Sequence, residues 1–120
     1  DRYGKLPHTL SLFDGKVPTL VFTSEGHSLP AGVEAVPVSS QGDIPSQVLA
    51  ELYRRNIQSV MIEGGSLILK AFLDAGLWDE ARIFVGEKWF ISGVKAPVIH
   101  QKPECEEKFG NSRLFVFRNK

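Results

Sequence analysis

The stretch Val60-Met61-Ile62-Glu63-Gly64-Gly65-Ser66-Leu67 decides how this chain is interpreted. The apolar run 59–62 is too short for anything except a buried strand. The glycine pair Gly64-Gly65 interrupts it, and apolar side chains then recur at helical spacing over 67–75 before Gly76. The stretch therefore predicts a buried strand, a glycine turn and a helix that ends at Gly76.

Similar patterns on both sides of this stretch continue the alternation of strands and helices. Asp43-Ile44-Pro45 predicts a helix start, because proline is tolerated in the first turn, and Asn56 marks its end. This order predicts an α/β domain with a mainly parallel sheet flanked by helices, in which the direction of the last strand stays open. The segment 1–18 is predicted to be loop, and the other predicted strands are 19–23, 33–38, 81–85 and 114–117.

The composition is that of one small globular domain. The 14 Lys and Arg balance the 14 Asp and Glu, which argues against binding to nucleic acid or to an anionic membrane. No stretch reaches the roughly 18 apolar residues of a membrane span. The single cysteine, Cys105, excludes an internal disulfide. We predict one cytoplasmic domain over 1–120, and because Asp1 is not an initiator methionine we treat the chain as a piece of a longer protein.

The glycine turn is the strongest candidate for a ligand site. It lies between the carboxyl end of a predicted strand and the start of a helix, where open α/β sheets bind ligands. Free amides at the helix start attract anions, and Gly64 and Gly65 would let a pyrophosphate reach the backbone. Ser66 could cap the helix or donate its hydroxyl. Glu63 would repel a phosphate, so it should face a hydrogen-bond donor of the ligand. The alternative is a turn in which the glycines only serve the backbone and Glu63 only favours the helix start.

A second group of candidates lies at the end of the first strand. Thr23 and Ser24 could bind an adenosine phosphate or ribose, although both residue types also favour plain turns. Arg2 and Lys5 could neutralise a 2′-phosphate, or simply be solvated. The three histidines lie in predicted loops without metal-ligand spacing, so we expect no metal site.

These residues resemble a known family. The phrase Ile62-Glu63-Gly64-Gly65-Ser66, followed by Phe72-Leu73-Asp74-Ala75-Gly76-Leu77 and Asp79-Glu80, is similar to the reductase domain of bacterial riboflavin biosynthesis. Asp1 to Pro7, Leu12-Phe13-Asp14-Gly15 and Pro18 to Thr23 also fit this family, as do Gly93, Ala96 and Pro97. That domain normally forms the C-terminal half of a bifunctional deaminase–reductase.

The resemblance implies a dihydrofolate-reductase-like α/β fold that uses NADPH to reduce the ribosyl group of 5-amino-6-(5-phosphoribosylamino)uracil to a ribityl chain. It implies substrate contact by Glu63, binding of the cofactor's phosphates by Gly65 to Leu69, and a position for Arg2 near the adenosine end. Gly64 and Thr23 join the predicted cofactor site on the residue-based argument given above. The cofactor residues in the loop and helix are Gly64, Gly65, Ser66, Leu67, Ile68 and Leu69. No residue is assigned as a general acid or base, because hydride transfer is the cofactor's own chemistry.

Family members carry further reductase residues ahead of the position of Asp1, so the resemblance also implies a domain that is incomplete at its N-terminal side. We expect the chain alone to be inactive, a deaminase domain to lie upstream, and the protein to be a homodimer that binds a small pyrimidine substrate. Two alternatives stay open. One is a non-catalytic α/β dimerisation module in which Trp89 and Phe90 form the subunit contact. The other is a dihydrofolate-reductase-like enzyme that acts on a different heterocycle.

Overall fold

The computed structural model describes residues 1–24 and 27–120 and divides the chain into two compact units, 1–59 and 60–120. Each unit is described by itself below. No helix within the described residues is long and apolar enough to cross a membrane. The single domain over 1–120 stays a prediction.

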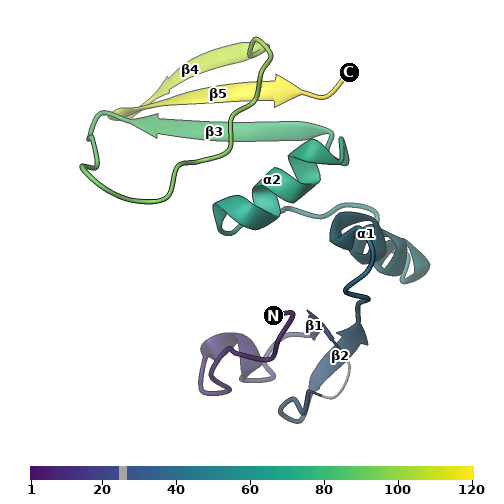
Figure 1. Cartoon of the computed structure of the whole chain (residues 1–120). Helices are drawn as coiled ribbons and strands as arrows, with labels where there is room; N and C mark the ends of the chain where they lie inside the picture. The colour runs from purple at the N-terminus through teal and green to yellow at the C-terminus, as the bar shows by residue number, and fades with distance from the viewer. Residues whose placement is uncertain (25–26) are drawn as a thin grey trace. The chain divides into compact units, whose positions relative to one another are not determined.

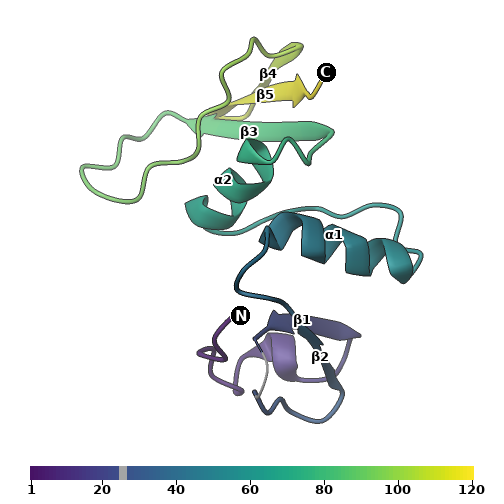
Figure 2. The ribbon, with the colours of Figure 1, turned by 45° about the vertical axis from the view of Figure 1, so that its right-hand side comes forward.

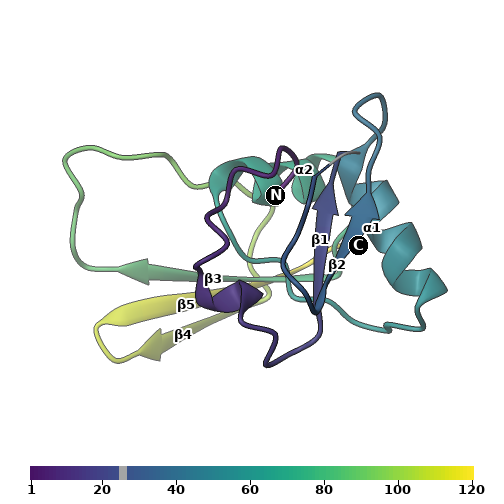
Figure 3. The ribbon, with the colours of Figure 1, turned by 90° about the horizontal axis from the view of Figure 1, so that it is seen from below.

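The first unit contains a two-stranded parallel sheet. Strand β1 (Thr19–Thr23) pairs with β2 (Val33–Pro37), and Figure 3 shows the two arrows side by side and pointing the same way. Both strands match the prediction. The 3-10 helix η1 (Ser11–Phe13) precedes β1, and the buried side chains of this unit come from η1, from both strands and from the residue after β2. They are Phe13, Val21, Thr23, Val36 and Val38, with Pro45 at the start of the following helix.

Helix α1 (Ile44–Arg54) begins and ends as its sequence predicts. The Asp43 carboxylate caps it by accepting a hydrogen bond of 2.9 Å from the backbone N–H of Ser46, and Pro45 occupies the first turn. The chain leaves the helical conformation at Asn56, where φ is 60°. Asparagine tolerates this left-handed conformation better than most residues, so Asn56 is a suitable end to the helix.

The second unit packs one helix beside a three-stranded antiparallel sheet. Helix α2 (Ser66–Asp74) lies next to β3 (Glu80–Gly86) in Figures 1 and 2. Strand β5 (Ser112–Arg118) runs between β3 and β4 (Cys105–Phe109). Phe72 of α2 and Phe117 of β5 are the buried aromatic residues of this unit.

Three expectations are corrected by these elements. The run 59–62 is not a strand: it pairs with no strand among the described residues, and Val60 and Met61 are 46% and 82% exposed. Strand β4 is not predicted from the sequence, because its charged residues Glu106, Glu107 and Lys108 give it no apolar run. The α/β class is confirmed, but parallel pairing holds only for β1 and β2 among the described strands. Strands β4 and β5 join through two residues, and such a short connection forces antiparallel pairing.

Candidate functional site

The start of α2 presents backbone amides without a side-chain cap. Gly65 is the N-cap residue, and no side chain in the described part of the chain accepts a hydrogen bond from the first turn of the helix. Ser66 is the first helical residue, so the predicted cap role does not fall to its hydroxyl, which stays a possible ligand donor. A helix start carries a partial positive charge and free N–H groups, and both favour an anion.

The two glycines ahead of α2 have different physical reasons to be glycine. Gly64 has φ of 139°, which other residues rarely adopt, and a Cβ there would come within 3.2 Å of Ile68 Cγ2. Gly65 has φ of −73° and ψ of 163°, an ordinary extended conformation, and a Cβ there would meet nothing within 4 Å. Neither strain nor packing among the described residues of this unit accounts for glycine at 65. The space beside its backbone is open within the unit, which fits the close contact that a phosphate group makes with a glycine loop.

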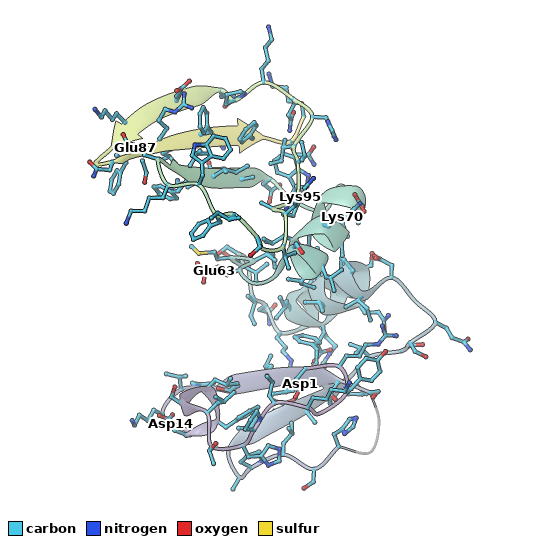
Figure 4. The ribbon with its side chains drawn as sticks, turned by 60° about the vertical axis from the view of Figure 1, so that its left-hand side comes forward. Asp1, Asp14, Glu63, Lys70, Glu87 and Lys95 are labelled. Carbon is cyan, nitrogen blue, oxygen red and sulfur yellow. The ribbon has the colours of Figure 1, made fainter. Side chains whose placement is uncertain are left out.

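The side chains around this turn carry no positive charge, and they range from half-buried to exposed. Glu63 and Leu67 are exposed, and Leu67 keeps 87% of its surface. Ser66, Ile68 and Leu69 are half-buried. Glu63 lies on the segment that leads into α2, while Lys70 lies on the helix (Figure 4) and forms an ion pair with Asp74. The stretch 63–69 contains no Lys or Arg, so an anion bound there would depend on backbone amides and the Ser66 hydroxyl.

The predicted residues of the first unit meet at the carboxyl end of β1. The backbone carbonyl of Arg2 accepts hydrogen bonds from Thr23 Oγ1 at 3.2 Å, from Ser24 Oγ at 2.8 Å and from the Ser24 N–H at 2.9 Å. The Ser24 hydroxyl also lies 3.2 Å from His27 Nε2. Thr23 is only 3% exposed, so its hydroxyl fastens residue 2 to the strand end. Direct cofactor contact by Thr23 stays a prediction.

The Arg2 side chain keeps hydrogen-bond donors that the described residues do not use. Its Nη2 donates to the Ser40 carbonyl at 3.2 Å, and the guanidinium carbon lies 5.4 Å from the centre of the Tyr3 ring. Its Nε is buried without a hydrogen-bond partner, and no carboxylate within the described residues pairs with it. A buried donor without a partner is costly, so Arg2 is suited to accept an anionic ligand at this end of the sheet.

Arg2 and Thr23 belong to the first unit, whereas Glu63 and Gly64 to Leu69 belong to the second. Within the first unit, Arg2 and Thr23 are in direct contact. Within the second unit, Glu63 and Gly64 to Leu69 follow one another along the chain. The sequence reading did not foresee the contact between Ser24 and His27. The only sign of this contact in the sequence is that Ser24 and His27 lie three residues apart, and this spacing is too common to predict a hydrogen bond.

Another charged cluster has a structural explanation. Arg55 forms ion pairs with Glu34 of β2 and, at 2.6 Å, with Glu51 of α1, and Arg54 also pairs with Glu51 at 2.7 Å. Hydrogen bonds from Arg54 and then Arg55 lower the pKa of Glu51 to about 2. These charges satisfy one another between a strand and a helix of the same unit, so they offer no free group to a ligand.

The thiol of Cys105 is not activated. It donates to Glu107 Oε1 at 3.3 Å, and this hydrogen bond, with desolvation and the nearby negative charge, raises the pKa of the thiol above its usual value. The thiolate form is the nucleophile, so a raised pKa argues against covalent catalysis at this residue.

Comparison with known proteins assigns this chain to a family. Residues 1–107 match the RibD C-terminal domain family, whereas no curated protein sequence matches the chain. Among solved structures, the chain is similar to a diaminohydroxyphosphoribosylaminopyrimidine deaminase/5-amino-6-(5-phosphoribosylamino)uracil reductase from Thermotoga maritima, with 27% identity and a TM-score of 0.76. It is also similar in fold to Acinetobacter baumannii RibD, with 20% identity and a TM-score of 0.78.

Both alignments cover 100% of this chain and 36% of the solved chain, so this sequence spans about a third of the length of those proteins. The agreement confirms the predicted dihydrofolate-reductase-like α/β fold. With the family match extending over most of the sequence, the chain belongs to the RibD C-terminal domain family.

Proposed function

We propose that this chain is the C-terminal part of an NADPH-dependent reductase domain in riboflavin biosynthesis. Its substrate would be 5-amino-6-(5-phosphoribosylamino)uracil, whose ribosyl group is reduced to a ribityl chain. The observation that carries the proposal is the open approach to Gly65 at the uncapped start of α2, in a chain of the RibD C-terminal domain family.

The start of α2 would hold the bridging phosphates of the cofactor. The amides from Gly65 to Ile68 are the candidate donors, with the Ser66 hydroxyl beside them, and Gly64 supplies the backbone turn that exposes them. The predicted contact by Leu69 cannot use its amide, because that N–H already donates to the Gly65 carbonyl at 3.4 Å. Hydrogen bonds between amides and a charged phosphate are stronger than those between neutral groups. Leu67 and Ile68 would contribute through their backbone, which explains why apolar side chains are acceptable at those positions.

Arg2 would recognise the 2′-phosphate that distinguishes NADPH from NADH. Among the described residues its Nε has no hydrogen-bond partner and its Nη2 donates to the Ser40 carbonyl, so the guanidinium keeps donors for an anion. Thr23 and Ser24 would position Arg2 through their hydrogen bonds to its carbonyl. Thr23 would thus act on the cofactor through Arg2.

Glu63 would bind the substrate, because its carboxylate is exposed and accepts hydrogen bonds from the N–H groups that a pyrimidine carries. The bound cofactor supplies hydride for the reduction. The chain's own residues orient the two molecules, and none of them is assigned a proton-transfer role.

The rest of the reductase domain, a deaminase domain further upstream and a second copy of the chain would complete the protein, which we place in the cytoplasm. A non-catalytic dimerisation module is the second candidate function. It is favoured by the exposed side chains of Trp89 and Phe90, which are 95% and 89% exposed.

Isothermal titration calorimetry with NADPH tests the proposal, on the chain and on the same chain extended at its N-terminal side by the residues its gene encodes. The extended protein should bind NADPH and reduce the ribosylamino-pyrimidine. Binding that is absent in the extended protein, or that bulky residues at both 64 and 65 leave unchanged, would contradict it and favour the non-catalytic module.

A further inference from the structure

The half-buried side chain of His27 is connected by hydrogen bonds to the backbone of Arg2. Its Nε2 lies 3.2 Å from the Ser24 hydroxyl, and that hydroxyl lies 2.8 Å from the Arg2 carbonyl oxygen. The same carbonyl also accepts hydrogen bonds from Thr23 Oγ1 and from the Ser24 N–H. The imidazole therefore contacts the group that fixes the chain at residue 2.

The Ser24 hydroxyl determines which ring nitrogen of His27 must carry a hydrogen. A carbonyl oxygen can only accept, so the single hydroxyl proton of Ser24 is donated to the Arg2 carbonyl. Toward His27 the Ser24 oxygen is then an acceptor, and Nε2 must be the donor. A hydrogen on Nε2 thus keeps the Ser24 hydroxyl directed at the Arg2 carbonyl.

The imidazole also packs against the turn that contains Arg2. A Cβ on Gly4 would come within 2.5 Å of Nδ1 and 2.8 Å of Cγ of His27, so the ring occupies the space that a side chain at residue 4 would need. The Gly4 N–H closes this turn by donating to the Asp1 carbonyl at 3.3 Å. His27 therefore contacts the backbone on both sides of Arg2, through the turn and through Ser24.

A fixed backbone at residue 2 is important because the Arg2 side chain has donors to offer a ligand. Its Nε is buried without a hydrogen-bond partner among the described residues, and its Nη2 donates to the Ser40 carbonyl at 3.2 Å. An arginine that is already ordered loses less conformational entropy when it binds an anion. The contacts that order residue 2 should therefore strengthen anion binding by its guanidinium.

We propose that His27 is a positioning residue for the guanidinium of Arg2. Its Nε2–H orients the Ser24 hydroxyl, and the hydroxyl fixes the carbonyl of the residue from which the guanidinium extends. This inference rests on the proposed function, in which Arg2 binds the 2′-phosphate of NADPH. Because His27 acts only through Arg2, its loss should reduce the preference for NADPH over NADH.

Calorimetric titrations with NADPH and NADH test this role in the N-terminally extended protein. His27→Phe keeps a ring but removes the donor, and it should raise the Kd for NADPH by about fivefold, the effect of one neutral hydrogen bond. The Kd for NADH should stay within about twofold of wild type. His27→Gln keeps an N–H near the position of Nε2 and should bring the Kd for NADPH back to within about twofold of wild type.

A double variant and a control separate positioning from a general structural effect. In an Arg2→Met background, His27→Phe should not change the Kd for NADPH further, because both substitutions act through the same guanidinium. His8→Phe is the matched control, since the exposed His8 ring packs against Phe13. It should change neither affinity. Thermal unfolding shows whether each variant is folded.

The nitrogen NMR spectrum of the wild-type imidazoles adds a measurement that needs no variant. It should place the hydrogen of neutral His27 on Nε2, and a hydrogen on Nδ1 alone would overturn the proposal. NADPH binding that His27→Phe leaves unchanged, or that weakens equally with NADH binding, overturns the role of His27 alone. The same holds if the effects of His27→Phe and Arg2→Met add up. A wild type that binds no NADPH overturns the proposed function itself.

Discussion

The two regions that contain the predicted site residues use their polar groups in opposite ways. At the end of β1, the hydroxyls of Thr23 and Ser24 and the carbonyl of Arg2 already satisfy one another, whereas the Arg2 side chain keeps a donor that no described residue uses. At the start of α2, no described side chain caps the helix, and a Cβ on Gly65 would meet no described atom within 4 Å. The first region is stabilised by internal hydrogen bonds, whereas the second leaves backbone amides without a side-chain partner among the described residues.

This difference indicates which substitutions should change ligand binding and which should change stability. Where a polar group is already bonded within the chain, its loss should weaken folding. Where donors face open space, filling that space should weaken binding and leave the fold intact. The following predictions start with the largest expected effect and refer to the form that binds NADPH, either the chain or its N-terminally extended version.

Gly65→Val should weaken NADPH binding by about 100-fold, which corresponds to the loss of about 2.7 kcal/mol from hydrogen bonds to a charged group. The branched side chain would fill the space in front of the amides. The melting temperature should stay near that of wild type, because the backbone conformation of Gly65 suits any residue. Calorimetry and thermal unfolding measure the two quantities. Gly86→Val is the control, since Gly86 also lacks a positive φ, and it should bind NADPH normally.

Gly64→Ala should act mainly on stability. With φ of 139° and Ile68 Cγ2 at 3.2 Å from a Cβ, alanine is strained at this position. We expect the free energy of unfolding to fall by about 1–2 kcal/mol, measured by urea denaturation. Gly65→Ala should cost less than about 0.5 kcal/mol in the same assay. Equal losses at 64 and 65 would remove the distinction between the two glycines.

Arg2→Met should lower the affinity for NADPH by about tenfold and leave the affinity for NADH within about twofold of wild type, because only the 2′-phosphate would contact the guanidinium. Methionine keeps much of the apolar stem. Lys5→Met is the charge-matched control and should change neither affinity. Parallel titrations with the two cofactors make the comparison. An equal loss for NADPH and NADH would place Arg2 away from the 2′-phosphate.

Thr23→Val should reduce the free energy of unfolding by about 1 kcal/mol, the value of one intramolecular hydrogen bond, because it removes the donor to the Arg2 carbonyl. Thr23→Ser keeps the hydroxyl and should recover most of that loss. A larger effect on NADPH affinity than on stability would show that Thr23 contacts the cofactor directly, as the sequence interpretation first predicted.

The smallest expected effect is a loss of folding stability at low pH. Arg54 and Arg55 hold the pKa of Glu51 near 2, below the ordinary value of 4.5. A carboxyl group with a lowered folded-state pKa stabilises the fold above pH 4.5, and this contribution is lost as the pH falls toward 2. Wild type should therefore lose stability between pH 4.5 and 2 more steeply than Glu51→Gln. Parallel acid titrations of thermal stability would show equal slopes for the two proteins if the ion pairs did not matter.

Local sequence signals predicted most of the elements. The Asp43 cap with Pro45 fixed the start of α1, and the apolar run 19–23 coincides with β1. The strand predicted over 59–62 failed because an apolar run forms a strand only beside a partner, and Val60 and Met61 have none among the described residues. Strand β4 was missed because pairing with β5 stabilises a charged sequence that has no strand pattern of its own.

The candidate site could also be predicted in part from the sequence. The glycine pair ahead of a helix indicates free amides from the sequence alone. That Gly64 is required by its backbone and Gly65 is not could be seen only from the dihedral angles and the neighbouring atoms. The internal use of the Thr23 hydroxyl likewise depends on residue 2, which lies 21 positions away in the sequence.

The most direct test of the central claim is an NMR titration of the isotope-labelled protein with NADPH. We expect saturable shifts of the backbone amides of Gly65, Ser66 and Leu67, together with the Nε–H signal of Arg2. Gly65→Val should remove the amide shifts while the remaining spectrum stays folded. Saturable binding that leaves the amides at the start of α2 unshifted would contradict the account.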